Sequence, residues 1–356
     1  MIKKLTSMKA MVLGATVLSV FMVSCQKDTL ETTIDKADST AVERLFDKID
    51  PEMQSFTIDP SQPKTITGSE GTVINIPANA FVHANGNKVT GSVTISLKEI
   101  LSLKDQITSG VYAVSNDSLL KSGGEFFFEA TANGQKLKLA VNQFITFDVP
   151  ADEVDPNMQV FVGNEVKQDS TGSSVNWVQA DSSQFKTVVT DSIFNQKDSV
   201  WSTDSSWIAS YKLYMTLSGY HMKVYDIYNT SYYNCDHYYN YPNLIQTLPF
   251  TVVNLEKSEE EIVDYTVKLV YKQLGSVIDG YSNTGQGMIV DNTFSGQISS
   301  TWLTGEDVVI IVVGVGKKSQ KTYFGKSTLN VAANSKPSVS ISVMSDADLS
   351  AALDNL

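Results

Sequence analysis

The feature that most constrains the fold of this chain is an alternation of apolar and polar residues with a period of two. In the clearest example, Val93, Ile95 and Leu97 alternate with small polar residues shortly after Gly91. Successive side chains of a β-strand point to opposite faces, so this pattern predicts strands with one buried face. The pattern recurs from Phe56 onward, and we therefore expect an all-β fold.

Two Asn-Gly pairs predict tight turns between such strands, at Asn85-Gly86 and Asn133-Gly134. Type I′ hairpin turns need positive φ at both central residues, and Asn and Gly tolerate that backbone conformation best. The second pair predicts a hairpin between residues 125–131 and 136–140, and a further strand is expected at residues 143–149.

A second β-rich region is expected at residues 261–345. The run Val308–Val313 is apolar at every position, which indicates a strand buried on both faces and predicts the central strand of a second sandwich. Ser345 and Asp348 have the spacing of a capping box, so a short helix is predicted to begin after Ser345 and to run to Leu356.

The N-terminus has the layout of a cleaved export signal. Three lysines precede an apolar run at residues 10–23, and the small residue Ser24 is followed by Cys25. The apolar run is shorter than the ~20 residues that span a bilayer. The segment Met22-Val23-Ser24-Cys25 resembles a bacterial lipobox, with Met where Leu is more usual. The resemblance implies cleavage before Cys25 and acylation of its thiol.

The residues after the cysteine bear on which side of the membrane the anchor lies. Gln26-Lys27-Asp28 resembles the surface-export signal of Bacteroidetes lipoproteins, which implies display on the outer leaflet of the outer membrane. Only one acid follows Lys27 directly, so a periplasm-facing anchor stays open as the alternative.

These features divide the chain into successive segments. We expect two β-sandwich modules after a lipoprotein signal and a flexible tether, with a short C-terminal helix. Within the tether, Val42, Leu45, Phe46 and Ile49 have the spacing of an amphipathic helix that could dock on the first module. The predicted segments are a signal peptide (1–24), the lipidated cysteine and tether (25–55), a first sandwich (56–165), a polar and then Tyr-rich insert or connection (166–260), a second sandwich (261–345) and the helix (346–356).

Three stretches of the first module resemble a family. They are residues 71–81 (GTVINIPANAF), residues 86–93 around Val89-Thr90-Gly91, and residues 120–125 (LKSGGE). These stretches resemble the β-sandwich module of Bacteroidetes surface lipoproteins and, distantly, the ZU-five-type sandwich of ankyrins and netrin receptors. The segment 261–345 is similar to transthyretin-like or immunoglobulin-like modules. The resemblance implies a fold and a setting, but no chemistry.

Ten of the chain's 15 tyrosines lie between Tyr211 and Tyr241. Exposed tyrosines suit recognition surfaces and sugar stacking, whereas a strand pair with cross-strand tyrosine ladders is the alternative. The stretch 232–238 (YYNCDHY) also resembles a Trp-Ile-Asn-Cys-Asp-Arg-Phe-type signature of the same lipoproteins. The candidate ligand-binding residues are Tyr225, Tyr228, Tyr232 and Tyr238.

Several Asp-Ser/Thr-apolar triplets resemble the O-glycosylation acceptor of Bacteroidetes exported proteins. Plain turn chemistry is the alternative, because Asp and Ser favour turns. The candidate acceptor residues are Thr29, Ser118, Ser192 and Ser199.

Charge argues against nucleic acid as a partner. The chain has 27 Lys and Arg against 39 Asp and Glu, and removal of the leader takes three lysines away, so the net charge changes from −12 to −15. Phosphate polymers are bound by basic surfaces, and Arg44 is the only arginine.

Residues suited to catalysis are few. Cys235 and His237 are expected on one face of a strand with Asp236 pointing away, which would permit a thiol–imidazole pair, but residues two apart on a strand lie about 7 Å apart. Asp148, Asp152, Glu153 and Asp155 could hold calcium or form a solvated turn, and we expect the turn. No catalytic residue, metal site or cofactor is predicted.

The sequence therefore predicts a lipid-anchored cell-envelope protein of the bacterial outer membrane, exposed at the cell surface and without enzymatic activity. Its expected roles are adhesion, envelope structure or ligand binding, with the membrane, a glycan or an envelope protein as partner. Two alternatives stay open: a glycan-binding protein that uses the Tyr-rich segment, and a hydrolase with an unrecognised site.

Overall fold

A computed structural model describes the chain from Thr40 onward, with internal gaps, and this part forms one compact unit. The leader, Cys25, Gln26, Lys27, Asp28 and Thr29 lie outside the described residues. In the described part of the chain, no helix is long and apolar enough to cross a membrane. The described residues are 40–116, 118–150, 155, 157–166, 173–180, 185–188, 193–195, 200–202, 220–224, 232–238, 244–255, 262–284 and 293–356.

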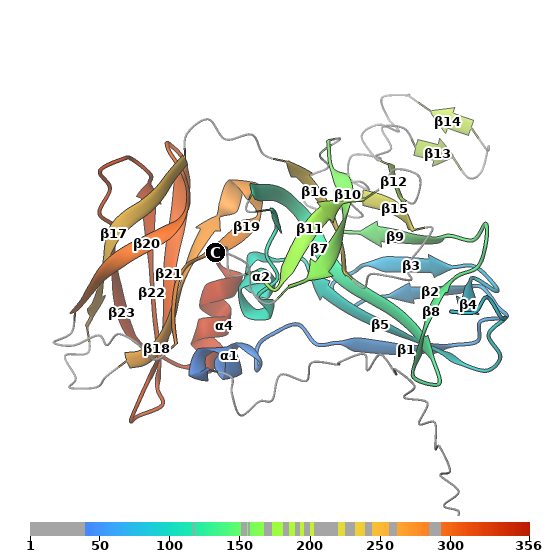
Figure 1. Ribbon diagram of the computed structural model, residues 1–356, viewed down its shortest axis with the longest axis horizontal. Coiled ribbons are helices and arrows are strands. Elements are labelled where there is room, and N and C mark those ends of the chain that lie inside the picture. Colours follow the sequence, from blue (N-terminus) through green and yellow to red (C-terminus); the bar gives the residue numbers. More distant parts are fainter. Residues whose placement is uncertain are drawn as a thin grey trace, which may run out of the picture. The chain divides into compact units, whose positions relative to one another are not determined.

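The predicted all-β fold is confirmed, and the first module is built on an antiparallel nine-stranded sheet (Figure 1). Its main order is β1-β5-β7-β16-β10-β11, while β6 and β8 pair with β7, and β4 pairs with β8. The strands are β1 (Gln54–Ile58), β4 (Phe81–His83), β5 (Val93–Ile100), β6 (Val114–Ser115), β7 (Ser118–Ala132), β8 (Gln135–Leu139), β10 (Gln159–Glu165), β11 (Val175–Gln179) and β16 (Tyr232–Tyr238).

A five-stranded sheet packs against one face of this sheet. The alternation noted in the sequence gives β5 and β7 an apolar face whose residues share one buried cluster with Ile74 and Phe147 of the second sheet. The rings of Phe126 and Phe147 stack with centroids 4.8 Å apart. The second sheet has the order β12-β15-β9-β3-β2, formed by Phe185–Val188, Tyr220–Val224, Ile145–Val149, Val73–Ile76 and Lys64–Thr67, and a separate pair joins β13 (Ile193–Asn195) to β14 (Val200–Ser202).

The C-terminal part has seven strands in the order β19-β18-β21-β22-β23-β17-β20. Strand β23 pairs parallel with β17 through residues 338–341 and antiparallel with β22 through residues 342–344. It therefore connects the strands β19-β18-β21-β22 to the strands β17-β20. The bounds are β17 (Leu244–Asn254), β18 (Ile262–Tyr271), β19 (Ser276–Thr284), β20 (Thr293–Leu303), β21 (Asp307–Gly316), β22 (Thr322–Asn330) and β23 (Ser338–Met344).

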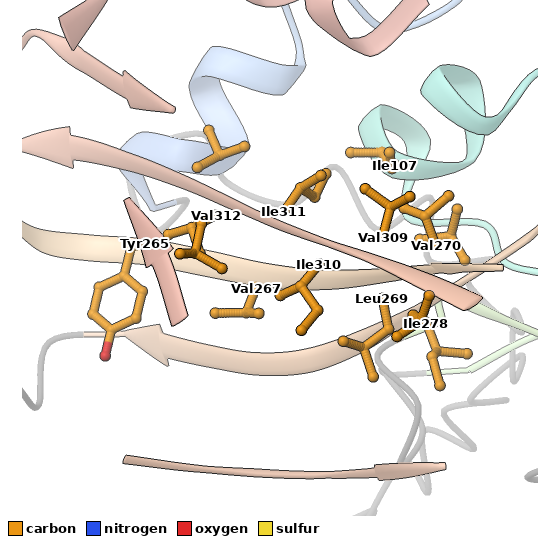
Figure 2. Packing of buried hydrophobic residues seen from close by; sticks show 14 of the residues in the cluster. Ile107, Tyr265, Val267, Leu269, Val270, Ile278, Val309, Ile310, Ile311 and Val312 are labelled. Atoms are coloured by element: carbon orange, nitrogen blue, oxygen red, sulfur yellow. The ribbon is translucent and has the colours of Figure 1, made fainter. Parts of the chain in front are cut away.

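Strand β21 is a central strand, as its apolar sequence predicts. It pairs with β18 on one side and β22 on the other, and residues 308–313 are all buried. Figure 2 shows Val309 and Ile311 on the side of the sheet where Ile107 lies, and Ile310 with Val267 on the other side. Both faces of the strand are therefore covered.

Short helices cover one of these faces. They are α1 (Ala41–Phe46), α2 (Leu103–Ser109), the 3-10 turn η1 (Lys272–Leu274) and α4 (Asp346–Asp354). The cap predicted at Ser345 is present, because its hydroxyl accepts a hydrogen bond from Asp348 N at 3.1 Å. Leu349 and Leu353 are buried.

The predicted amphipathic helix near the N-terminus is present, but the surface that covers it differs from the prediction. Residues 40–55, assigned to the tether, contain α1 and the start of β1. The apolar stripe of α1 joins the buried cluster of the second module rather than the first, and Val42 N donates to Asp264 Oδ2 at 3.0 Å. The period of a helix reveals that one face is apolar, but it does not reveal which sheet covers that face.

Residues 166–260, expected as an insert or a connection, supply strands to both modules. Strand β16 lies between β7 and β10, while β12 and β15 extend the five-stranded sheet, and β17 belongs to the second module. The first module therefore contains strands from beyond residue 165.

The two predicted turns differ in conformation. Asn133 and Gly134 have φ of 51° and 72°, as a type I′ turn requires. At the other pair only Gly86 has positive φ, at 85°, and its N–H donates to His83 O at 2.8 Å. The turn at Asn85-Gly86 is therefore not type I′.

Candidate functional site

The four candidate tyrosines do not form a described surface. Tyr225 and Tyr228 lie outside the described residues, and Tyr232 lies on β16 opposite Phe127. Tyr238 is 45% exposed, and its ring contacts Phe161 edge-on with centroids 5.2 Å apart.

The O-glycosylation candidates are also mostly outside the described residues, since Ser192 and Ser199 are not described. Ser118 is the described one, and it is exposed at the start of β7. Its position at a strand end is accessible to solvent, so it stays a candidate.

The residues of the candidate thiol–imidazole pair have environments unlike those of a catalytic pair. The Cys235 thiol is buried, and burial together with the charges of Asp236 and Asp155 raises its pKa well above the usual value. A thiol must ionise to act as a nucleophile, so this environment opposes nucleophilic chemistry. His237 Nδ1 lies 3.7 Å from Asp155 Oδ2.

Asp236, which the alternation of a strand directs away from Cys235 and His237, accepts a hydrogen bond from Asn234, two residues before it. A register shift between Asn234 and Asp236 interrupts the pairing of β16 with β7. The extra residue of this bulge lies on β7, where Ser122 and Glu125 are three positions apart, opposite two positions on β16. Asp236 is fully buried, as are Asn234 and Glu125.

The bulge brings together four polar side chains, which we call the acidic cluster: Ser122, Glu125, Asn234 and Asp236. Asn234 lies directly opposite Glu125, and Asp236 lies opposite Ser122. Asn234 Nδ2 donates to Asp236 Oδ2 at 2.8 Å, and Ser122 Oγ donates to Glu125 Oε1 at 3.1 Å. Two strands thus present two carboxyl groups, an amide and a hydroxyl to one another.

The cluster is electrostatically unbalanced. Burial, and for Glu125 also the neighbouring charge of Asp236, raises the pKa of both carboxyl groups well above the usual values. Neither carboxyl group has an ion-pair partner among the described residues, and buried charges are normally paired. The dianionic form is therefore strongly disfavoured unless a positive charge enters.

Two oxygen atoms of the cluster also lack a hydrogen-bond donor. They are Glu125 Oε2 and Asn234 Oδ1, and both are buried. Buried polar atoms without partners are rare in native proteins, and each costs about 1–3 kcal/mol. The two atoms belong to residues that face each other across the strand pair.

Glu99 shows how this protein stabilises a buried carboxylate by hydrogen bonds alone. Its Oε1 accepts from Thr72 N, and its Oε2 accepts from Glu70 N and Gln54 Nε2, each at 2.9 Å. A Cβ atom at Gly68 would clash with this carboxylate, so glycine permits the close approach. The acidic cluster lacks such a set of donors.

The acidic cluster lies close to a polar junction between the two modules. Gln106 Nε2 donates to Gly275 O at 2.7 Å, and Gln106 Oε1 accepts from Val277 N at 3.2 Å. The Ser276 hydroxyl donates to Leu120 O, two residues before Ser122 in β7. These contacts join α2 and β7 of the first module to η1 and β19.

A buried cation lies in the same junction. Lys268 forms an ion pair with Asp279, and its Nζ donates to Tyr112 OH at 2.6 Å. Burial alone would lower the pKa of Lys268, but Asp279 and Tyr112 outweigh that effect and raise it. Lys268 therefore stays charged at physiological pH.

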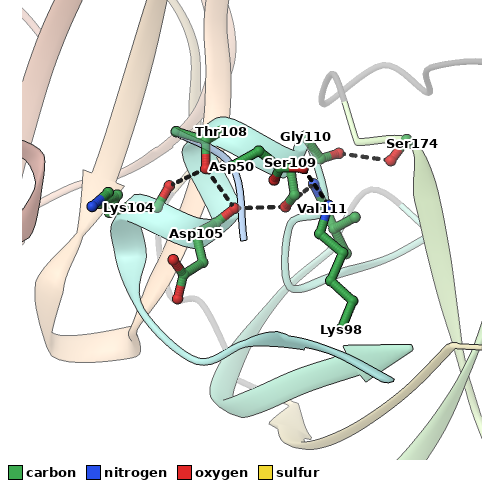
Figure 3. A network of polar contacts seen from close by, with 9 residues as sticks. All are labelled: Asp50, Lys98, Lys104, Asp105, Thr108, Ser109, Gly110, Val111 and Ser174. Atoms are coloured by element: carbon green, nitrogen blue, oxygen red, sulfur yellow. Dashed lines mark hydrogen bonds and ion pairs between the residues drawn. The ribbon is translucent and has the colours of Figure 1, made fainter. Parts of the chain in front are cut away.

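Hydrogen bonds also fix α2 within the first module (Figure 3). Ser109 Oγ donates to Asp105 O at 2.6 Å, and the carbonyl of Gly110 accepts from Ser174 Oγ at 2.9 Å. Lys98 forms an ion pair with Asp50, just after α1.

The structure describes two of the four acids that the sequence offers for calcium, Asp148 and Asp155. Asp152 and Glu153 lie outside the described residues, while Asp155 pairs with Lys121 at 3.0 Å. In the described part of the chain, no group of three or more His, Cys, Asp and Glu side chains is placed to hold a metal ion.

No protein-family model matches this chain, and neither does any curated protein sequence. The resemblance to Bacteroidetes lipoproteins therefore stays a prediction from the quoted stretches.

Sequence reasoning missed Glu125 and the role of Asp236. One signal was available for each, because Glu125 directly precedes three phenylalanines and Asp236 lies among aromatic residues. A charged residue inside an apolar strand indicates a buried polar site, but the sequence does not reveal its partner.

Proposed function

We propose that this chain is a lipid-anchored protein of the bacterial outer membrane, exposed at the cell surface, that acts in adhesion, envelope structure or ligand binding without catalysing a reaction. The observation that carries the proposal is the leader that ends at Ser24-Cys25 ahead of a folded unit that begins at Thr40. The acyl chains on Cys25 hold the protein at the membrane, since two or more chains give stable anchoring.

The distance between anchor and folded unit fits this role. Fourteen residues lie between Cys25 and Thr40, and a fully extended chain of this length spans at most about 50 Å. This length limits how far the folded unit can lie from the anchor. Its hydrogen-bonded junction between modules supports a structural or binding role.

The location is tested by protease treatment of intact cells. We expect the wild-type chain to be digested and a Lys27→Ala/Asp28→Ala variant to be protected, because the proposed export signal is removed. A Cys25→Ala variant should lose labelling by palmitate and should be released from the membrane fraction. Protection of the wild-type chain in intact cells would contradict surface exposure, and absence of palmitate labelling would contradict the anchor.

A glycan ligand is the second candidate. One observation favours it, namely the exposed ring of Tyr238, whose hydroxyl lies 3.1 Å from Ser115 Oγ. Aromatic faces with a polar tip suit sugar stacking. We expect glycan-array binding that is weakened by Tyr238→Ala and retained by Tyr238→Phe, and an array without signal would contradict this candidate.

A further inference from the structure

The acidic cluster has the composition of an incomplete ligand set. It contains two carboxyl groups, an amide and a hydroxyl, all supplied by β7 and β16. Directly opposite residues of an antiparallel pair have Cβ atoms about 5 Å apart on one face. Glu125 Oε2 and Asn234 Oδ1, the two atoms without donors, therefore belong to neighbouring side chains.

An N–H donor, a proton or a cation could satisfy these oxygens. Glu99 accepts two backbone N–H groups at 2.9 Å. In the acidic cluster the contact of Gly123 N with Asp236 Oδ1 is longer, at 3.4 Å, and no donor reaches Glu125 Oε2 or Asn234 Oδ1. A proton on Glu125 Oε2 that is donated to Asn234 Oδ1 would satisfy both atoms, but only while that carboxyl group stays protonated. A cation contacts the carboxylates and the amide oxygen together, and it also balances the charge.

We propose that Glu125, Asn234, Asp236 and Ser122 form a binding site for a hard divalent cation, Ca²⁺, between strands β7 and β16. All four residues provide oxygen ligands, and Ca²⁺ accepts carboxylate, amide and hydroxyl oxygens in irregular geometry at about 2.3–2.6 Å. Mg²⁺ fits less well, because it keeps several waters and the cluster is buried. Binding releases the protons held by the carboxyl groups, at most one from each, into solvent.

The surroundings of the cluster agree with a cation. Asp105 of α2 adds a further negative charge that Glu125 senses, and Cys235 beside Asp236 is neutral. A Cβ at Gly275 of the second module would lie 3.3 Å from Ser122 O, so the junction packs directly on the strand that supplies two of the ligands. The cation would fix the bulge of β7 and support this junction.

The test is Ca²⁺ binding by the full chain in detergent, freed of metal with EDTA. We expect one Ca²⁺ per chain by native mass spectrometry. With Ca²⁺ at about 100 times its dissociation constant, the melting temperature should rise by about 5 °C. A chain that binds no Ca²⁺ would overturn the proposal, and so would one whose melting temperature only rises as the pH is lowered, because protons alone would then satisfy the cluster.

Variants connect the binding to these residues. Glu125→Gln/Asp236→Asn keeps the size of both side chains and removes both charges. It should abolish both Ca²⁺ binding and the rise in melting temperature that Ca²⁺ causes. Glu129→Gln, on the same strand, removes a carboxylate that pairs with Lys136 and should leave both unchanged. If the double variant does not fold, Asn234→Ala, which removes one ligand oxygen, should weaken Ca²⁺ binding at least tenfold. Wild-type affinity in either ligand variant would overturn the proposal.

Discussion

Substitution of Lys268 tests how strongly the junction stabilises the protein. Lys268 and Asp279 are 8% and 12% exposed, and the ammonium also lies 5.2 Å from the centre of the Tyr112 ring. Lys268→Met keeps the length of the side chain but removes the positive charge from a largely buried carboxylate. Removing one partner of a buried pair costs about 3–5 kcal/mol. Because Asp279 keeps slight access to water, we expect a loss of about 3 kcal/mol.

The assay is urea unfolding of the full chain, followed by circular dichroism and by tryptophan fluorescence. The matched control is Lys48→Met, which breaks an ion pair with Asp346 whose side chains are 62% and 46% exposed. Exposed pairs contribute less than about 1 kcal/mol. A Lys268→Met variant that loses no more stability than the control would refute the reasoning.

A double variant separates the charge from the packing. Lys268→Met/Asp279→Leu replaces the ion pair with apolar groups, and such replacements are often neutral or stabilising. We expect the double variant to be more stable than Lys268→Met alone by at least about 2 kcal/mol. A double variant as unstable as the single one would show that the loss comes from packing, and not from the buried charge of Asp279 that Lys268→Met leaves behind.

Three further predictions concern single sites. The pKa of Glu125 is raised by burial and by Asp236, so the stability linked to its proton is present at low pH and is lost as pH rises; in EDTA, the free energy of unfolding should fall as pH rises above the usual pKa of a glutamate, and less so in Glu125→Gln. Gly325→Ala should cost about 1–3 kcal/mol in urea unfolding, because its Cβ would meet the carbonyl oxygen of Ser340, whereas a change near zero would contradict the close contact. Cys235 should resist thiol reagents at pH 8 in the native protein and react once urea unfolds it, and rapid native labelling would contradict its burial.

Local features of the fold could be predicted from the sequence because they depend on neighbouring residues. The positive φ values of Asn133 and Gly134 follow from the identity of these two residues. The cap at Ser345 needs a hydroxyl and the N–H of Asp348. The apolar run 308–313 needs cover on both faces, wherever that cover comes from.

The pairing of distant strands could not be predicted in the same way. Strand β16 lies between β7 and β10, and no local pattern in Tyr232–Tyr238 specifies these neighbours. The bulge beside Asp236 depends on this pairing, since it is a mismatch between two strands. The sequence likewise does not reveal that α1 packs on the second module, because an apolar stripe does not identify the surface that covers it.

The pairing of β7 with β16 links two stretches that the sequence presents separately. Leu120 lies opposite Tyr238, and Glu125 lies opposite Asn234, so the stretches 120–125 and 232–238 run beside each other. Their contact contains the whole acidic cluster.

Protons and Ca²⁺ compete for this cluster, and the competition distinguishes the two ways to satisfy it. With protons alone, the raised pKa values of Glu125 and Asp236 make the protein less stable as pH rises. With Ca²⁺ present, a rise in pH removes the competing protons and strengthens binding, which adds stability in the same pH range. The dependence of stability on pH should therefore be steep in EDTA and shallow in Ca²⁺. The ion pair of Lys268 does not affect this comparison. The raised pKa of Lys268 keeps the contribution of the ion pair to stability constant until strongly alkaline pH.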